Sequence, residues 1–211
     1  PYLRPETQGT LTLGRNLRTI GESAFCESTY TGSLTIPDSV VEIGKRAFYK
    51  CENLNGTLTL GRSLRTIGKE AFYWCAFTGS LTIPEGVAEI ADGAFSSLYQ
   101  FNRDGMFNGT LTLPSTLKTI GASAFAYTDF SGELLIPDGV TSIGANAFKE
   151  CDGFGGLLSL PDSVKTVGEW AFYLCKGFTG LKLSAGLTKI EKLSFAHMYG
   201  LRTEVVIPEG V

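Results

Sequence analysis

The stretch Ile-Pro-Asp-Gly-Val-Thr-Ser-Ile-Gly-Ala-Asn-Ala-Phe-Lys-Glu-Cys, residues 136–151, decides the fold, because variants of it recur along the whole chain. An aliphatic residue that closes a short apolar pair recurs at intervals of 23 or 24 residues, with one interval of 30, and stands at Leu13, Ile36, Leu60, Ile83, Leu113, Ile136, Leu160, Leu183 and Ile207. A phenylalanine preceded by Ala or Ser follows the first eight of these, at Phe25, Phe48, Phe72, Phe95, Phe125, Phe148, Phe172 and Phe195. Repeats of this length predict a solenoid, in which each coil buries its apolar residues only against its neighbours.

Each repeat divides into three expected elements. In Gly-Ser-Leu-Thr-Ile-Pro, residues 32–37, apolar and polar residues alternate, which predicts a strand with one buried face. The proline lacks an N–H and is expected to end the ladder. The segment Val-x-x-Ile-Gly then predicts a short second strand, and x-x-Ala-Phe-x-x-Cys predicts one or two helical turns. The phenylalanine is expected to fill the space between coils.

The motif Ile-Pro-x-x-Val-x-x-Ile-Gly-x-x-Ala-Phe-x-x-Cys, as in residues 136–151, resembles the BspA-like leucine-rich repeat, also called the Treponema-type repeat. The repeats are most similar to the variant common in gut Bacteroidetes surface proteins, in which Gly-Ser/Thr-Leu-Thr-Ile/Leu opens each strand. The resemblance implies a curved solenoid in a cell-surface or secreted protein. It also implies adhesion to host matrix proteins or to other bacteria.

We therefore expect an α/β repeat solenoid that is right-handed, with a parallel β-sheet on the concave face, short second strands and short helical turns. Residues 1–211 are predicted to form a single leucine-rich-repeat domain of about eight repeats of 23–24 residues plus a partial ninth, with an insertion near residues 98–106. Solenoids need polar capping units, and neither end resembles one. We interpret the chain as a segment of a longer protein.

The composition excludes several classes of protein. Hydrophobic residues make up 43% of the 211 positions, too many for a disordered chain, and no apolar run approaches the roughly 20 residues that span a bilayer. A net charge of −3 provides no basic surface for nucleic acid. The single histidine, His197, has no nucleophilic or acidic partner in a recognisable motif, so we predict neither an enzyme nor a cofactor.

Four cysteines occupy one position of the repeat, three residues after the phenylalanine: Cys51, Cys75, Cys151 and Cys175. Other repeats have Leu98, Thr128 or Met198 there, so we expect a buried position in which cysteine acts as a small hydrophobic residue with a free thiol. The pairs Cys51/Cys75 and Cys151/Cys175 lie one coil apart, roughly 5 Å, so a disulfide within either pair stays open. No cluster of His or Cys predicts zinc or another metal.

The outward positions of the first strand form a ladder that is the main candidate for partner binding. Its members are Thr12, Thr35, Thr59, Thr82 and Thr112. Solenoids generally present such a sheet as an extended binding surface. The alternative is that threonine is simply favoured on a half-exposed strand.

Two further sets of residues are candidates. The insertion contains Tyr99, Phe101 and Arg103, residue types that are common at interface hot spots, although it could equally be a bulge that covers a coil edge. Tyr73 and Trp74, near the expected helical turn, could stack on sugars or pack along adjacent coils.

The resemblance, together with these features, implies a noncatalytic, adhesion-type recognition module of a bacterial cell-surface or secreted protein. Its partner would be a protein or glycan on a host or microbial surface, and the module itself a monomer. The alternatives are a glycan-binding module and a purely structural stalk.

Overall fold

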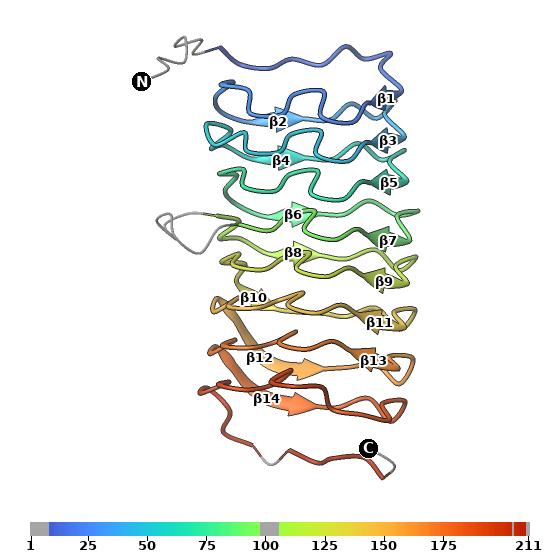
Figure 1. The fold of residues 1–211 in the computed structure, drawn as a ribbon, viewed down its shortest axis with the longest axis vertical. Helices are drawn as coiled ribbons and strands as arrows, with labels where there is room; N and C mark the ends of the chain where they lie inside the picture. Colours follow the sequence, from blue (N-terminus) through green and yellow to red (C-terminus); the bar gives the residue numbers. More distant parts are fainter. Residues whose placement is uncertain (1–8, 98–105, 204, 210–211) are drawn as a thin grey trace.

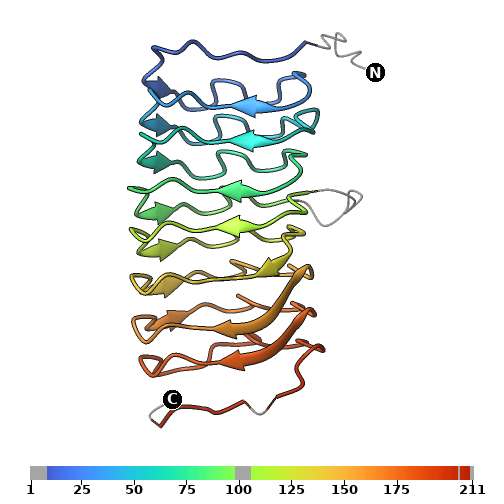
Figure 2. The ribbon, with the colours of Figure 1, turned by 180° about the vertical axis from the view of Figure 1, so that it is seen from behind.

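A computed structural model describes residues 9–97, 106–203 and 205–209 as one stack of coils, most of which pass through two short strands (Figure 1). The second strand of each coil contributes to a continuous, parallel, seven-stranded sheet in the order β1 (Thr19–Ile20), β3 (Glu42–Ile43), β5 (Thr66–Ile67), β7 (Glu89–Ile90), β9 (Thr119–Ile120), β11 (Ser142–Ile143) and β13 (Thr166–Val167). In Figure 2 the same sheet forms one edge of the stack from end to end. The solenoid architecture predicted from the repeats is confirmed.

The first strands, which follow the glycine of each repeat, form three smaller parallel sheets. These are β2 (Leu34–Thr35) with β4 (Leu58–Thr59), β6 (Leu81–Thr82) with β8 (Leu111–Thr112), and β10 (Gly132–Glu133) with β12 (Phe154–Ser159) and β14 (Phe178–Lys182). The register between β12 and β14 shifts at Gly156 and Leu157. Most of these strands are only two residues long, whereas β12 and β14 have six and five residues.

The predicted helical turns are wrong: in the described part of the chain, the segment around each phenylalanine forms successive β-turns and contains no helix. In the second coil, the N–H groups of Ala47, Tyr49 and Cys51 donate to carbonyls three residues back, at 3.1–3.3 Å. The N–H groups between them, of Arg46, Phe48 and Lys50, donate to the next coil at 2.8–2.9 Å.

The hydrogen-bonding pattern explains why no helix forms. An α-helix needs every N–H to reach the carbonyl four residues back, but every second N–H here is committed to the neighbouring coil. Arg46 and Lys50 also have positive φ angles, 54° and 55°, as the third residue of a type II turn requires. The fold is therefore a β-solenoid, and the α/β class is corrected.

A column of stacked phenylalanine rings runs through the centre of the stack. Neighbouring rings lie 5.1–5.6 Å apart, centroid to centroid, and within 14° of parallel, along Phe25, Phe48, Phe72, Phe95, Phe125, Phe148, Phe172 and Phe195. The separation is close to the spacing of about 4.8 Å between parallel strands. One ring per coil thus fills the interior at the distance that the backbone ladder imposes.

A second column of rings packs edge-on against the first. Phe77, Phe107, Phe130 and Phe154 each meet a ring of the central column at 6.0–6.2 Å and 72–81°. Aromatic pairs favour this T-shaped geometry, which adds roughly 0.5–1.5 kcal/mol per pair to the burial of area. In these four repeats, the second phenylalanine therefore packs directly against the central ring of its own coil.

At Gly68, which follows β5, adjacent coils approach too closely to leave room for a side chain. A Cβ on Gly68 would lie 2.5 Å from the backbone nitrogen of Lys45 and 2.6 Å from the carbonyl carbon of Gly44. Backbone atoms cannot move away without breaking the ladder. The high glycine content of the chain is therefore partly a consequence of coil-to-coil packing.

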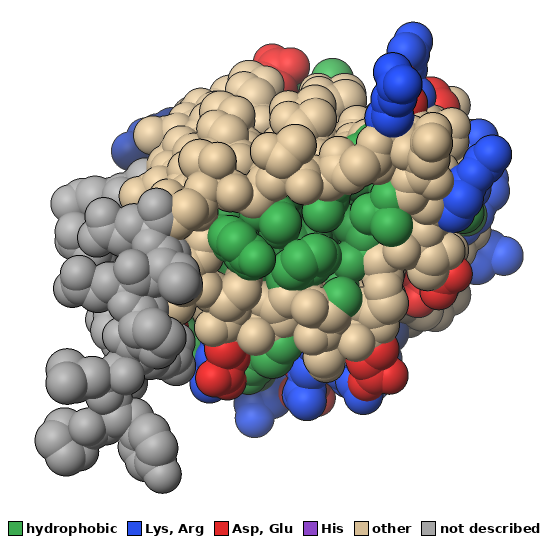
Figure 3. All heavy atoms as spheres, turned by 90° about the horizontal axis from the view of Figure 1, so that it is seen from above, with side chains coloured by type: hydrophobic (Ala, Val, Ile, Leu, Met, Phe, Trp, Pro, Cys, Tyr) green, Lys and Arg blue, Asp and Glu red, His purple; other side chains and the backbone are tan. Residues whose placement is uncertain are grey.

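The N-terminal end of the stack leaves part of the core accessible. Figure 3 looks down on this end, where apolar side chains gather at the centre. Leu11, Leu17 and Phe25 are only half-buried there, whereas their equivalents one coil further on, Leu34, Val40 and Phe48, are buried. Burial in this fold thus depends on having a neighbour on both sides.

Replacing Phe125 with alanine should destabilise the protein far more than the same change at Phe195. Phe125 is fully buried between two stacked rings, so the substitution should remove about 3–5 kcal/mol from the free energy of unfolding. Phe195 is half-buried and stacks on Phe172 alone among the described rings, so its loss should be clearly smaller. Urea unfolding followed by circular dichroism measures both, and equal losses would contradict the stacked-core description.

Candidate functional site

The structure places the predicted threonine ladder on one face of the stack. Thr35, Thr59, Thr82 and Thr112 are the outward residues of β2, β4, β6 and β8, and Thr12 occupies the same position in the first coil. All five side chains are exposed, and the leucine before each strand threonine is buried. The register pairs Thr35 with Thr59 and Thr82 with Thr112. The five residues are therefore brought together as predicted, one per coil.

The ladder differs from the neighbouring outward column in its hydrogen bonds. In that column the Thr57 hydroxyl donates to the Ser33 oxygen, and the Thr110 hydroxyl donates to the Ser80 oxygen, both at 3.2 Å. Among the described residues, by contrast, the hydroxyl groups of the ladder threonines make no hydrogen bond to protein. The ladder consequently offers both donors and acceptors to a partner, while the neighbouring column helps to hold the coils together.

The middle of the ladder borders a shallow groove of about 470 Å³. Thr59 and Thr82 line it, with Arg62 and Glu85 among the charged residues of its wall. Arg62 donates to the Asp38 carboxylate of the preceding coil at 2.7 and 3.0 Å, and these hydrogen bonds hold the pKa of Asp38 below its usual value. The charged residues beside the ladder are thus mostly engaged in links between coils.

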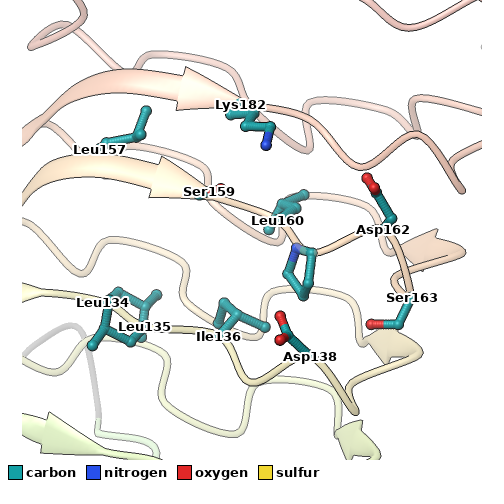
Figure 4. A pocket seen from close by; sticks show the side chains of 11 residues that line it. Leu134, Leu135, Ile136, Asp138, Leu157, Ser159, Leu160, Asp162, Ser163 and Lys182 are labelled. Carbon is teal, nitrogen blue, oxygen red and sulfur yellow. The ribbon is translucent and has the colours of Figure 1, made fainter.

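Beyond Thr112 the polar ladder gives way to exposed leucines. Leu135 follows it in the same column and is 71% exposed, and Leu157 lies in the adjacent column of the next coil and is 53% exposed. The two line a groove of about 490 Å³, shown in Figure 4. The sequence-based candidates did not include these two leucines, although an apolar residue in an otherwise polar column was the available signal.

The other end of this groove is acidic. Asp138 and Asp162 stand in the turns that follow the strands, and Lys182 projects from β14 (Figure 4). Asp162 accepts a hydrogen bond from the backbone N–H of Ala185 in the next coil, at 3.1 Å. Asp138 makes no such bond within the described part of the chain. Its carboxylate therefore faces the groove without a protein partner.

Tyr73 and Trp74, the candidate sugar-stacking residues, are half-buried and already in contact with neighbours. The ring of Tyr73 stacks on Tyr49 at 5.3 Å, and the Lys50 ammonium lies 4.8 Å from the Trp74 ring centroid. Burial raises the pKa of the Tyr73 hydroxyl. These contacts favour the packing role over an open stacking surface, without testing sugar binding.

His197 contacts two tyrosines in the described part of the chain. His197 is exposed, its Nδ1 lies 2.6 Å from the Tyr199 hydroxyl, and its ring meets Tyr173 edge-on. Tyr99, Phe101 and Arg103 of the insertion lie outside the described residues. Over the described ranges, no three His, Cys, Asp or Glu side chains gather as a metal site, and no helix is long and apolar enough to cross a membrane.

The four core cysteines are buried free thiols, and each donates a hydrogen bond to the carbonyl of a phenylalanine in the preceding coil. The distances from sulfur to carbonyl oxygen are 2.9–3.1 Å. In the order of the cysteines, the acceptors are the carbonyl oxygens of Phe25, Phe48, Phe125 and Phe148. Burial raises the pKa of Cys151 to about 12 and the pKa of Cys75 and Cys175 well above the usual value. Hydrogen bonding, chiefly with the Cys75 thiol, lowers the pKa of Cys51 to about 7. The position is more than apolar filling, because its S–H links successive coils.

Comparison with known proteins agrees with this geometry. A family model of the BspA type leucine rich repeat region matches residues 7–103 and 98–211, in six copies. No curated protein matches the sequence.

Three solved structures resemble the chain. A leucine-rich repeat protein from Bacteroides ovatus is 22% identical with a TM-score of 0.65 over 92% of this chain, which spans about half (53%) of the other's length. A Treponema pallidum leucine-rich repeat protein is 23% identical with a TM-score of 0.53, covering 90% of this chain and 75% of its own. A leucine rich cell surface protein from Faecalibacterium prausnitzii is 24% identical with a TM-score of 0.46, covering 96% and 75%. At this identity, the first two support the fold alone.

The cysteine geometry predicts that the native protein exposes a single reactive thiol. Cys26 is half-buried, whereas Cys51, Cys75, Cys151 and Cys175 have at most 1% of their surface exposed. At pH 8 a thiol with a pKa of about 12 is ionised in roughly one molecule in 10⁴, and access limits Cys51. Ellman's reagent should titrate one thiol rapidly in the native protein, and five in denaturant without reductant.

A Cys26→Ser variant is the matched control and should lose only the rapid phase. Fewer than five thiols in the denatured, unreduced wild-type protein would show that one of the coil-to-coil pairs is bridged.

Proposed function

Because the chain belongs to the BspA-type leucine-rich repeat proteins, we propose that it is a noncatalytic module that recognises a macromolecule on a host or microbial surface. The proposal includes a location at a cell surface or secretion from the cell, which the family resemblance implies, and a monomeric state. Repeat proteins of this kind are in general interaction or structural modules.

The observation that carries the proposal is the ladder of exposed threonine hydroxyls without hydrogen bonds to protein. From Thr12 to Thr112 it crosses four coil intervals, about 19 Å at the usual strand spacing. Threonine has few rotamers, so the ladder side chains themselves lose little conformational freedom when a partner binds. An extended strip of fixed donors and acceptors suits a protein surface better than a small molecule.

Two competing functions have weaker support. Glycan binding would use Tyr73 and Trp74, but these rings already contact Tyr49 and Lys50. A purely structural stalk needs no bound partner and leaves the unbonded hydroxyls without a role. The ladder therefore favours protein recognition.

Changing three ladder residues to lysine should abolish partner binding. The variant Thr35→Lys/Thr59→Lys/Thr82→Lys places three long charged side chains where a partner would approach. We expect affinity for the matrix protein that the wild type binds to fall at least tenfold, about 1.4 kcal/mol. The measurement is surface plasmon resonance against immobilised fibronectin, laminin and collagen.

The matched control is Thr19→Lys/Thr66→Lys/Thr166→Lys, which adds the same charges at exposed positions of the seven-stranded sheet. It should bind within twofold of the wild type. Equal losses in both variants would contradict recognition by the ladder. A glycan-array signal that disappears with Trp74→Ala would favour the glycan function instead.

A further inference from the structure

The groove beyond the threonine ladder has an apolar end built from residues that break the repeat. The column of Leu135 has threonine in the five preceding coils, and the column of Leu157 has Thr10, Ser33, Thr57, Ser80, Thr110 and Glu133. Leu157 leans toward the next coil, since a Cβ on Gly180 would lie 3.0 Å from its Cδ1. Gly180 thus leaves room for this side chain. Both exposed leucines line the same groove, where an apolar group of a partner can cover them.

The acidic end is held at a defined distance from the apolar end. Asp138 follows Leu135 by three residues of nearly extended chain, which corresponds to about 10 Å. Asp162 stands at the equivalent position of the next coil and also lines the groove. Against these two carboxylates the lining has one cation, Lys182, so its formal charge is −1. Glu133 lies beside the apolar end and adds to the negative field, because a Cβ on Gly156 would meet its Cγ at 3.4 Å.

The floor between the two ends supplies a hydroxyl. Ser159, at the ladder position of its coil, lines the groove and makes no side-chain hydrogen bond within the described residues. Asp138 is likewise unpaired there, whereas the carboxylates at the same position of other coils are bonded: Asp38 to Arg62, Glu85 to Ser115 and Asp162 to Ala185. The groove therefore combines apolar contact, one free hydroxyl and one free carboxylate.

We propose that this groove binds an extended protein segment that presents an apolar side chain and, three residues away, a lysine or arginine. The apolar side chain would lie against Leu135 and Leu157, and the cation would meet Asp138 and Asp162. The groove lining contains no aromatic ring on which a sugar could stack, and its net negative charge disfavours an acidic ligand. The inference rests on the proposed function and names the chemistry of the partner.

Peptide display tests this specificity directly. The probe is a random linear peptide library on phage, panned against the immobilised chain, followed by fluorescence polarisation of the enriched peptides as synthetic, labelled molecules. We expect enriched sequences to share an apolar residue and a Lys or Arg three positions apart. The variant Leu135→Thr/Leu157→Ser, which restores residues typical of the two columns, should weaken their binding at least tenfold.

Charge variants test the acidic end separately. Asp138→Asn should weaken binding several-fold and reduce its dependence on salt, because a screened charge pair is lost. Asp38→Asn, at the same position of an earlier coil, should leave binding unchanged. Thermal unfolding of each variant confirms that it folds, and the affected side chains are all exposed.

Each alternative outcome overturns the proposal. The groove does not select this pattern if the leucine variant binds the peptides unchanged. The same conclusion follows if the enriched peptides lack the apolar-to-basic spacing. Concentration-dependent dimerisation that the leucine variant abolishes identifies a second copy of the chain as the occupant. Loss of matrix-protein binding in the threonine variant, with no peptide effect in the leucine variant, supports the proposed function and overturns only this inference.

Discussion

The match between ring stacking and strand spacing is the constraint on which the rest of the structure depends. Phenylalanine rings 5.1–5.6 Å apart fill the interior at nearly the distance that parallel backbone ladders impose. One coil has no core of its own, as the half-buried Phe25 at the end of the stack illustrates. Inward positions must therefore repeat, while outward positions are free to vary as long as the coils stay in register.

This constraint explains how much of the fold could be predicted from sequence. Most of the periodic leucines, isoleucines and phenylalanines are buried or half-buried inside the stack, so the interval between them predicts the solenoid directly. The turns around Phe48 could not be predicted in the same way, because Arg46 and Lys50 have no intrinsic preference for positive φ. Their conformation is imposed by hydrogen bonds to the next coil, a long-range effect that local sequence does not encode.

The candidate site was predictable in position but not in detail. Strand alternation places both Ser33 and Thr35 outward, and the sequence does not indicate which of the two hydroxyl groups forms a hydrogen bond within the protein. The structure separates them, since Thr57 bonds to Ser33 while Thr35 has no hydrogen bond from its side chain. Leu135 and Leu157 were visible as exceptions to the repeat, but the groove they form depends on Gly180 and on turns one coil away.

A binding site in such a molecule can arise by releasing contacts that other coils use for cohesion. At the position after the strand, Asp38, Glu85 and Asp162 each accept a hydrogen bond from the following coil. Asp138 accepts none from a described residue, and one position in each of two mostly hydroxyl-bearing columns is leucine at the other end of the same groove. The stack tolerates these losses because the central rings and the seven-stranded sheet continue through the same coils. The redundancy of the core is therefore what allows one part of the surface to specialise.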